Sequence, residues 1–336
     1  MTSPARGVTL ASLMTMGPAR WSSAAESAAR LGYGSIWVAE TTGPEAFASL
    51  GALAPLAPGL GLGTGVLALQ LRTPMLAAMG AATLQALHPE RDVLLGIGIS
   101  SPAVVDRWHG ATYGTRPLAQ VREYLTLVRQ CWGGEPVDFD GDYYHCRRFR
   151  LGIRLGERRP RLVLGALNAR MLAVAGELAD GVLLNYLPAS GVPWCVEQVR
   201  AAEAAAGREP GACTVYAYVH VGVTDLDSAR DAAQADLFSY AVVDSYAAAF
   251  RRTGFADEVD AIRSAHAARD RATALAAVSD RMIQSIDIVG SAAEVSAAVT
   301  AYEAAGVDHA VVMPLPWGTD RDRVIADTLA AAAPGA

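Results

Sequence analysis

The chain has 336 residues, of which 52% are hydrophobic and 18% are charged, and its net charge is −6. The composition excludes a disordered chain, and the acidic balance argues against a nucleic-acid partner. No apolar run approaches the roughly 20 residues of a membrane helix, so we expect no membrane partner.

The cysteine and histidine patterns address compartment and metal binding. Four widely spaced cysteines form no CxxC pair, and the segment before the first expected strand lacks the apolar core of a signal peptide. We therefore expect reduced cysteines and a cytoplasmic protein. The six histidines show no ligand spacing, so no metal is expected.

Eight apolar runs of strand length recur along the chain. They span residues 7–13, 35–40, 60–69, 93–99, 161–167, 181–186, 213–223 and 307–315. Helical patterns separate them at 22–31, 46–56, 73–87, 117–132, 169–178, 195–206 and 291–305. Parallel strands need crossover helices, so this alternation predicts an α/β fold, a (β/α)8 TIM barrel, over an open doubly wound sheet.

The chain is longer than the roughly 250 residues of a plain barrel. The surplus lies at residues 100–160, where a hairpin is expected over 138–144, and at about 225–289, which is alanine-rich and helical. We interpret both as insertions on one domain spanning residues 1–336.

Catalytic groups of such barrels lie at the carboxyl ends of the strands. The candidates there are rich in glycine and poor in charge. They include no adjacent carboxylate pair, no Ser-His-Asp arrangement and no GxGxxG turn. This composition is typical of a wall that holds a flat cofactor and leaves the chemistry to it.

Four segments at strand ends carry a family resemblance. In chain order they are IWVAE at 36–40, LGTGV at 62–66, LGIG at 95–98 and MLAVAGELADGVLLN at 171–185. Together they resemble the bacterial-luciferase-like flavin and deazaflavin oxidoreductases, most closely the branch that uses coenzyme F420 and includes methylene-tetrahydromethanopterin reductase. The resemblance covers residues 7–223 and 286–316.

The resemblance implies a set of cofactor-binding residues. Thr64, Gly65 and Val66 match the strand that bulges against the back of the ring, with a cis peptide at Gly65-Val66. Gly98 and Ser101 match the turn beside the ring, and Asn185 and Tyr186 match positions along the ring and its ribityl chain. The segment Gly165, Ala166, Leu167 and Asn168 matches the turn that takes the cofactor phosphate, where helix N–H groups suit an anion. Asn168 also suits a plain helix cap.

Two residues are candidates for proton transfer. Glu40 ends the second strand where relatives place an acid beside the ring, although a solvated surface charge is the alternative. His109 follows the fourth strand on a loop over the rim, with a hydrogen-bonded structural role as its alternative. Sugar-phosphate dehydrogenases of this branch have a histidine at the position of Thr41 and a glutamate at that of Ser101, so their activity is not expected.

The resemblance implies an F420-dependent oxidoreductase that acts on a small molecule. Hydride would pass from the deazaflavin C5 to an activated C=C or C=N bond, or from an alcohol or amine in reverse. The alternatives are an FMN-dependent monooxygenase of the same fold and a cofactor-free structural paralogue. A homodimer is expected by resemblance. The arginines between 147 and 161 form either a solvated loop or a contact for the anionic tail of the cofactor.

Overall fold

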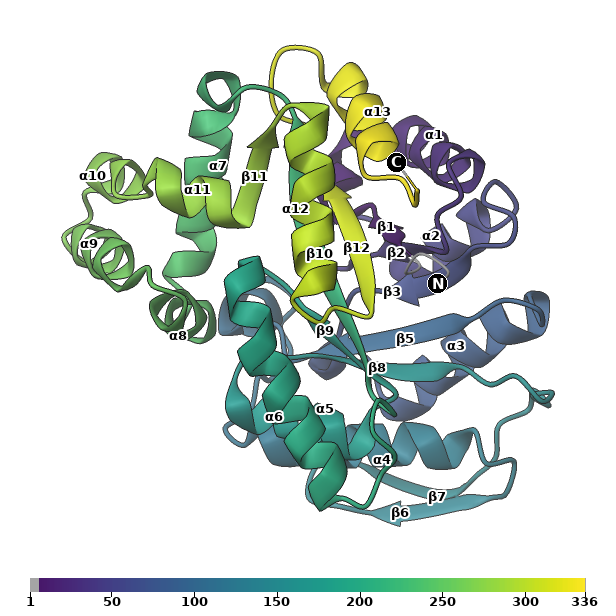
Figure 1. Cartoon of the computed structure of the whole chain (residues 1–336). Helices are drawn as coiled ribbons and strands as arrows, with labels where there is room; N and C mark the ends of the chain where they lie inside the picture. The colour runs from purple at the N-terminus through teal and green to yellow at the C-terminus, as the bar shows by residue number, and fades with distance from the viewer. Residues whose placement is uncertain (1–5, 336) are drawn as a thin grey trace.

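The computed structural model describes residues 6–335 and shows a closed barrel of eight parallel strands (Figure 1). The barrel strands are β1 (Gly7–Thr9), β2 (Ser35–Val38), β3 (Gly61–Thr64), β5 (Val93–Gly98), β8 (Arg161–Gly165), β9 (Gly181–Leu184), β10 (Thr214–Val223) and β12 (His309–Pro314). Each pairs with the next around the ring, and the pairing of β9 with β10 closes it. The expected TIM barrel is confirmed.

Eight helices surround the strands. They are α1 (Pro18–Arg30), α2 (Ala46–Leu53), α3 (Pro74–Leu87), α4 (Pro117–Cys131), α5 (Ala169–Leu178), α6 (Val192–Ala205), α12 (Ala292–Ala304) and α13 (Arg321–Ala331). α1 begins at Pro18 and not at the expected residue 22, because Gly17 turns the chain with a positive φ and Pro18 suits a first turn. α13 was not expected. Among residues 6–335, no helix has the length and hydropathy needed to cross a bilayer.

Short elements join these strands and helices. They are β4 (Leu67–Ala68), which pairs with β5, the 3-10 turns η1 (Ala11–Met16), η2 (Leu69–Leu71) and η4 (Ala189–Gly191), and the π-helical η3 (Ala103–Trp108). The expected hairpin is present as β6 (Val137–Asp140) and β7 (His145–Phe149). The excursion at 100–160 is therefore one short helical segment, α4 and a hairpin.

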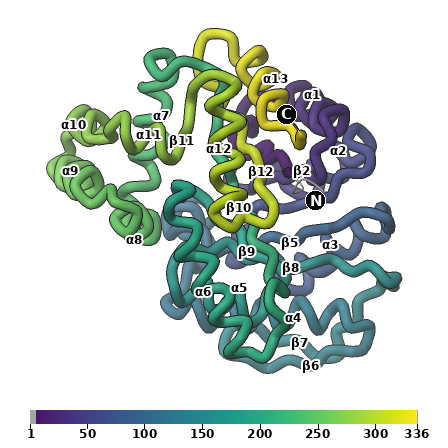
Figure 2. The backbone as a smooth tube through the Cα atoms, viewed as in Figure 1, coloured from purple at the N-terminus to yellow at the C-terminus, as the bar shows by residue number. Residues whose placement is uncertain are grey.

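The second excursion forms a helical lobe at one side of the barrel (Figure 2). It contains α7 (Leu226–Ala241), α8 (Asp244–Arg252), α9 (Ala256–Ala267), α10 (Arg271–Ala276) and α11 (Asp280–Ile286). Its apolar side chains form a separate core around Phe250, Ile262 and Met282. Unlike the expected helical run to residue 289, residues 287–290 form the strand β11 (Asp287–Gly290).

Strand β10 is unusually long because it pairs with two strands, one after the other, along the same edge. Its first residues pair with β9, from Thr214 opposite Gly181, and its last residues pair with β11, from His220 opposite Asp287. β12 covers its other edge. The upper half of β10 therefore extends past the end of β9 and brings β11 and the helical lobe to the rim of the barrel.

Arg6, the residue before β1, is held against the last two helices of the chain. The guanidinium of Arg6 forms a largely buried ion pair with Glu303 at 2.7 Å and donates to the carbonyls of Ala332 and Ala333. This contact joins the segment before β1 to α12 and to the end of α13.

Candidate active site

The alternation of side chains along the strands decides which residues enter the barrel. Leu183 of β9 and Tyr216 and Tyr218 of β10 lie in the interior cluster. Two residues further along each strand, Asn185 and His220 therefore point inward one layer closer to the rim.

Glycines at the ends of β5 and β8 continue this layer next to β9. A Cβ built on Gly98 would lie 2.7 Å from the Val66 Cγ2 atom, and one on Gly165 would lie 3.4 Å from Val66 Cγ1. A Cβ on Gly96 would overlap the carbonyl oxygen of Thr64. The predicted residues Val66, Gly98 and Gly165 thus come together in a wall of bare backbone around one partly exposed valine.

The peptide bond between Gly65 and Val66 is cis, as the resemblance implied. The hydroxyl of Tyr218, which lies across the barrel in β10, donates to the Gly65 carbonyl oxygen at 2.9 Å. A side chain at position 65 would collide with that hydroxyl. Only glycine fits between this tyrosine and the third strand.

Thr64 and Ser101 have local partners for their side chains. The Thr64 hydroxyl donates to the Gly96 carbonyl oxygen at 2.9 Å and accepts from the Gly96 N–H at 2.8 Å, and the residue is buried. The structure therefore gives this side chain an interstrand role. Ser101 Oγ lies 3.4 Å from the N–H of Val104 at the start of η3, and Ser101 remains partly exposed at the end of β5.

The predicted phosphate turn leads from β8 into α5. Asn168 occupies the N-cap position, but its side chain makes no capping hydrogen bond. Its carbonyl oxygen accepts from Met171 and Leu172, so the N–H groups of Ala169 and Arg170 face out of the helix end. A residue that the sequence did not indicate also reaches this turn: Arg252 of α8 donates to the Leu167 carbonyl oxygen at 2.9 Å.

Arg252 is held beside the turn by a second contact. Its guanidinium carbon lies 3.7 Å from the ring centre of Trp194, a cation–π arrangement. Burial of part of this group lowers its pKa. The side chain otherwise stays accessible and adds positive charge where helix N–H groups already point.

Asn185 and Tyr186 face different directions. Asn185 is partly exposed toward the barrel mouth. Tyr186 has a positive φ of 49°, and its buried ring stacks on Tyr240 of the helical lobe at 3.6 Å. Its hydroxyl donates to the Asp236 carboxylate at 2.9 Å. The side chain of Tyr186 therefore joins the lobe to the barrel.

Glu40 is held by an arginine. Its carboxylate pairs with Arg72 at 2.9 Å and accepts from the N–H of Ala46 at 3.0 Å. Arg72 also pairs with Glu45 and lies over the ring of Phe47. The group ties the end of β2 to the start of α2 and to the turn before α3, so this carboxylate is not a free charge.

His109 reaches the same part of the rim. Its Nε2 lies 2.7 Å from the carbonyl oxygen of Thr41, the residue after Glu40, and its imidazole is exposed. The structure therefore brings the two predicted proton-transfer candidates to one side of the barrel mouth. The loop that carries His109 is anchored there by this hydrogen bond.

A buried polar cluster lies beside Asn185, and the sequence analysis did not identify it. His220 contacts Asp287 through Nδ1 at 2.8 Å and Asn185 Oδ1 through Nε2 at 2.8 Å. Burial lowers the pKa of His220 to about 4 and raises that of Asp287 to about 8. Burial, together with the nearby Asp287, raises the pKa of Asp236 to about 7. The available signal was a histidine at an inward position of an apolar strand.

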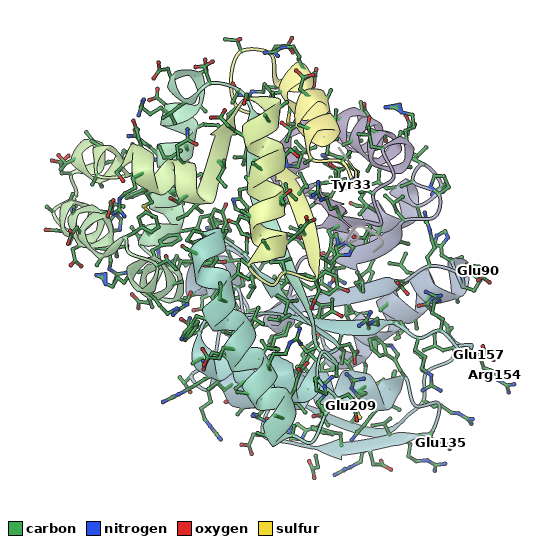
Figure 3. All side chains as sticks on the ribbon, viewed as in Figure 1. Tyr33, Glu90, Glu135, Arg154, Glu157 and Glu209 are labelled. Atoms are coloured by element: carbon green, nitrogen blue, oxygen red, sulfur yellow. The ribbon has the colours of Figure 1, made fainter. Side chains whose placement is uncertain are left out.

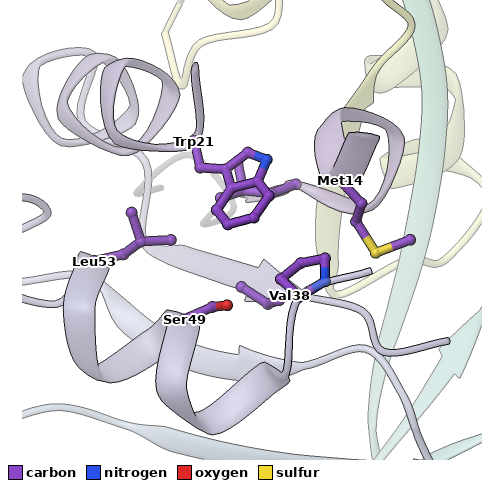
Figure 4. A pocket seen from close by; sticks show the side chains of 7 residues that line it. Met14, Trp21, Val38, Ser49 and Leu53 are labelled. Atoms are coloured by element: carbon purple, nitrogen blue, oxygen red, sulfur yellow. The ribbon is translucent and has the colours of Figure 1, made fainter. Parts of the chain in front are cut away.

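Two hollows lie away from this layer. A small apolar gap with no room for water lies among α1, α2 and the ends of the first strands, where Trp21, Met14 and Leu53 meet (Figure 4). A cleft of about 450 Å³ is lined by Trp132, Arg150, Arg154 and Arg159. It lies before Arg161, at the amino end of β8, and Arg154 projects on the side away from the helical lobe (Figure 3). The basic segment is thus remote from the predicted site.

Sequence comparison agrees with this architecture. A family model described as luciferase-like monooxygenase matches residues 4–309. A Mycobacterium tuberculosis protein named "Putative coenzyme F420-dependent oxidoreductase" is 30% identical, covering 84% of this chain and 86% of its own. The 5,10-methylenetetrahydromethanopterin reductase of Archaeoglobus fulgidus is 30% identical, covering 79% of both chains.

Comparison with solved structures addresses the fold. The coenzyme F420-dependent tetrahydromethanopterin reductase of Methanopyrus kandleri superposes with a TM-score of 0.81 over 98% of both chains, at 22% identity. An F420-dependent secondary alcohol dehydrogenase superposes with a TM-score of 0.76 over 99% of both chains, at 18% identity. The resemblance found in the sequence is confirmed, and the chain belongs to the luciferase-like family.

Proposed function

We propose that the protein is an oxidoreductase that binds coenzyme F420 and transfers a hydride between it and a small organic molecule. The F420-dependent relatives support the choice of coenzyme. The observation that carries the proposal is the glycine wall around Val66, because a planar ring needs backbone free of side chains for close contact. When bound, the coenzyme supplies hydride transfer at C5 of its ring.

The residues around Val66 suit such a ligand. The amide of Asn185 can hydrogen-bond a polar ring edge, and the partly exposed Val66 can contact an apolar face. These groups fix orientation without adding charge, and alignment of donor and acceptor governs hydride transfer. They support the predicted roles of Gly65, Val66, Gly98, Gly165 and Asn185.

The turn before α5 is the proposed anion site. The N–H groups of Ala169 and Arg170 and the guanidinium of Arg252 converge there. A helix N-terminus with one added cation suits a phosphate group. We assign the backbone of Gly165, Ala166, Leu167 and Asn168 to this role.

His109 is the favoured proton-transfer residue, because it is exposed and its Nδ1 has no partner among the described residues. Glu40 forms an ion pair with Arg72 and so fixes the part of the rim that His109 contacts. We therefore propose Glu40 as the group that positions this rim. The substrate class is an activated C=C or C=N bond, or an alcohol or amine in the reverse direction.

The free cysteines support a cytoplasmic protein.

A titration of the purified protein with F420 and with FMN tests the coenzyme. We expect F420 to bind at least tenfold more tightly, because the relatives are F420-dependent and the site offers an anion turn beside the wall. Quenching of deazaflavin fluorescence measures the affinity. Tightly bound FMN would favour the monooxygenase, and binding of neither would favour the cofactor-free paralogue.

Arg252→Ala should weaken F420 binding about tenfold, equivalent to about 1.4 kcal/mol, because it removes one charge-assisted contact to phosphate. Its neighbour Arg251 is the matched control, since it lies on the same helix and pairs with Asp260. Arg251→Ala should leave the affinity unchanged. Equal losses in both variants, or a loss for the phosphate-free deazaflavin chromophore as well, would contradict the assignment of this turn.

His109→Gln should lower kcat about 100-fold with an unchanged dissociation constant for F420, because a positioned proton donor contributes at least that factor. Loss of the absorbance of the oxidised coenzyme reports turnover with an alcohol, and its return from the reduced coenzyme reports turnover with an iminium substrate. His145→Gln is the control, since His145 is exposed on the remote hairpin. An unchanged kcat for His109→Gln would assign this histidine a structural role.

We also propose a homodimer that buries the outer face of α3. Leu76, Met79 and Leu87 are 48%, 45% and 64% exposed on this helix, and their spacing places them along one stripe. The chain should elute as a dimer, and Met79→Glu with Leu87→Glu should convert it to a monomer in light scattering. The control is a charge reversal at exposed Asp231 of α7, which should leave the dimer intact. A monomeric wild-type chain contradicts this proposal.

A further inference from the structure

Asn185 belongs to a buried cluster whose other members have no role in the proposed function. It joins three strand ends to the helical lobe, and its members are Asn185, Tyr186, His220, Asp236, Tyr240 and Asp287. His220 and Asp287 are 1% and 0% exposed. Groups buried this completely have few possible partners, so the hydrogens on Asn185 and His220 can be assigned from the contacts.

The orientation of the Asn185 amide comes first. The N–H of Tyr186 lies 3.0 Å from Asn185 Oδ1, and a backbone N–H requires an acceptor. Oδ1 is therefore the amide oxygen, and it also lies 2.8 Å from His220 Nε2. Nε2 must then carry a hydrogen and donate to this oxygen.

The rest of the chain of hydrogen bonds follows from that assignment. Burial favours the neutral imidazole, so Nδ1 is an acceptor when Nε2 carries the hydrogen. Nδ1 lies 2.8 Å from Asp287 Oδ1, which therefore donates as a protonated carboxyl. The raised pKa of Asp287, about 8, is consistent with this form at neutral pH. A carboxylate oxygen of Asp236, from α7, lies within 4.8 Å of this carboxyl, whose Oδ2 has no hydrogen-bond partner among the described residues.

The consequence for Asn185 concerns its nitrogen. Both donors reach Oδ1, and no acceptor for Nδ2 occurs among residues 6–335. Because Asn185 is partly exposed and points into the barrel, its two amide hydrogens are left for a ligand at the mouth, beside the strand that carries Gly165. A flipped amide would place two N–H groups against each other and is excluded energetically.

We propose that His220 and Asp287 are positioning residues that fix the Asn185 amide, so that its nitrogen donates to an acceptor oxygen or nitrogen of the bound ligand. The identity of the ligand as the deazaflavin rests on the proposed function, whereas the orientation of the amide does not depend on it. The helical lobe lies against this network, because Asp236 of α7 accepts from the Tyr186 hydroxyl and has a carboxylate oxygen within 4.8 Å of Asp287.

The same three side chains could hold a metal ion, since ligand atoms of His220, Asp236 and Asp287 lie within 4.8 Å of one another. In the hydrogen-bonded arrangement a proton lies between His220 and Asp287 instead of a metal ion. Metal binding would require both carboxyl groups to ionise in a buried place, which is costly. The neutral network is therefore the arrangement we test.

The first experiment needs no coenzyme. Long-range ¹H–¹⁵N spectra of ¹⁵N-histidine-labelled protein report the tautomer of each histidine, and the signal lost in His220→Gln identifies His220. For His220 of the wild-type protein we expect the Nε2–H tautomer, with no protonation of the imidazole between pH 5.5 and 7.5. We expect the same result in Asp287→Asn, because the asparagine amide can donate to Nδ1 as the carboxyl does. An Nδ1–H tautomer, protonation near pH 6.5, or a Zn²⁺-induced shift of this signal would overturn the inference.

The second experiment is a double-mutant cycle on F420 affinity with Asn185→Ala, His220→Phe and the pair together. We expect each single variant to weaken binding about tenfold and the pair to lose no more than either, because both remove the same oriented donor. His220→Gln should retain most of the affinity, since its amide can also donate to Asn185. Additive losses, or wild-type affinity in His220→Phe, would contradict the positioning role.

The two experiments separate the possible failures. If the wild-type chain binds no F420 but shows the expected tautomer, the proposed function fails and the orientation of Asn185 stands. If the chain binds F420 and the cycle is additive, the proposed function stands and the positioning role fails. Circular dichroism of each variant shows whether it folds, and His220→Gln provides the conservative variant if His220→Phe does not.

Discussion

The structure depends on the long strand β10 and on the two neighbours that share its edge. Its lower half closes the barrel against β9, and its upper half pairs with β11. Two inward side chains of this strand contact other strand ends, one across the interior and one on the neighbouring strand. Tyr218 donates to the carbonyl oxygen of Gly65, and His220 contacts Asn185. Without the extension past β9, neither β11 nor the helical lobe would meet the barrel mouth.

The charged side chains of the rim lie on either side of the glycine wall and not within it. Arg72 pairs with Glu40 and Glu45 on one side, and Arg252 stands at the α5 turn on another. Between them lie backbone, one valine and an amide. A flat and mostly uncharged ring with an anionic appendage matches this distribution, because each part meets groups of suitable polarity. The geometry thus agrees with the chemistry suggested by the relatives.

The helical lobe contributes to the proposed site although its sequence contains no motif that we could interpret. α8 supplies Arg252, and α7 supplies Asp236 and Tyr240, which both contact Tyr186. The lobe has its own apolar core and so can hold these groups firmly against the barrel. An insertion of this kind can alter specificity while the barrel strands stay the same.

The sequence alone determined the eight strands, the barrel and the glycine wall. Strand and helix periodicity is local, and glycines at strand ends remain visible in the chain. The family resemblance also indicated the cis peptide at Gly65-Val66. Two local predictions were not met. The Asn168 side chain makes no capping hydrogen bond. The strand β11 was not predicted, because its four residues carry little periodicity and lie between helices.

Only the tertiary structure decided which polar groups meet. Glu40 and Arg72 are separated by 32 residues, His220 and Asp287 by 67, and Leu167 and Arg252 by 85. Nothing in a single sequence links such residues, because hydrogen bonds and ion pairs depend on where the crossovers and the lobe place their side chains. For the same reason the sequence identified Asn185 as a candidate but did not reveal that a buried histidine sets the direction of its amide.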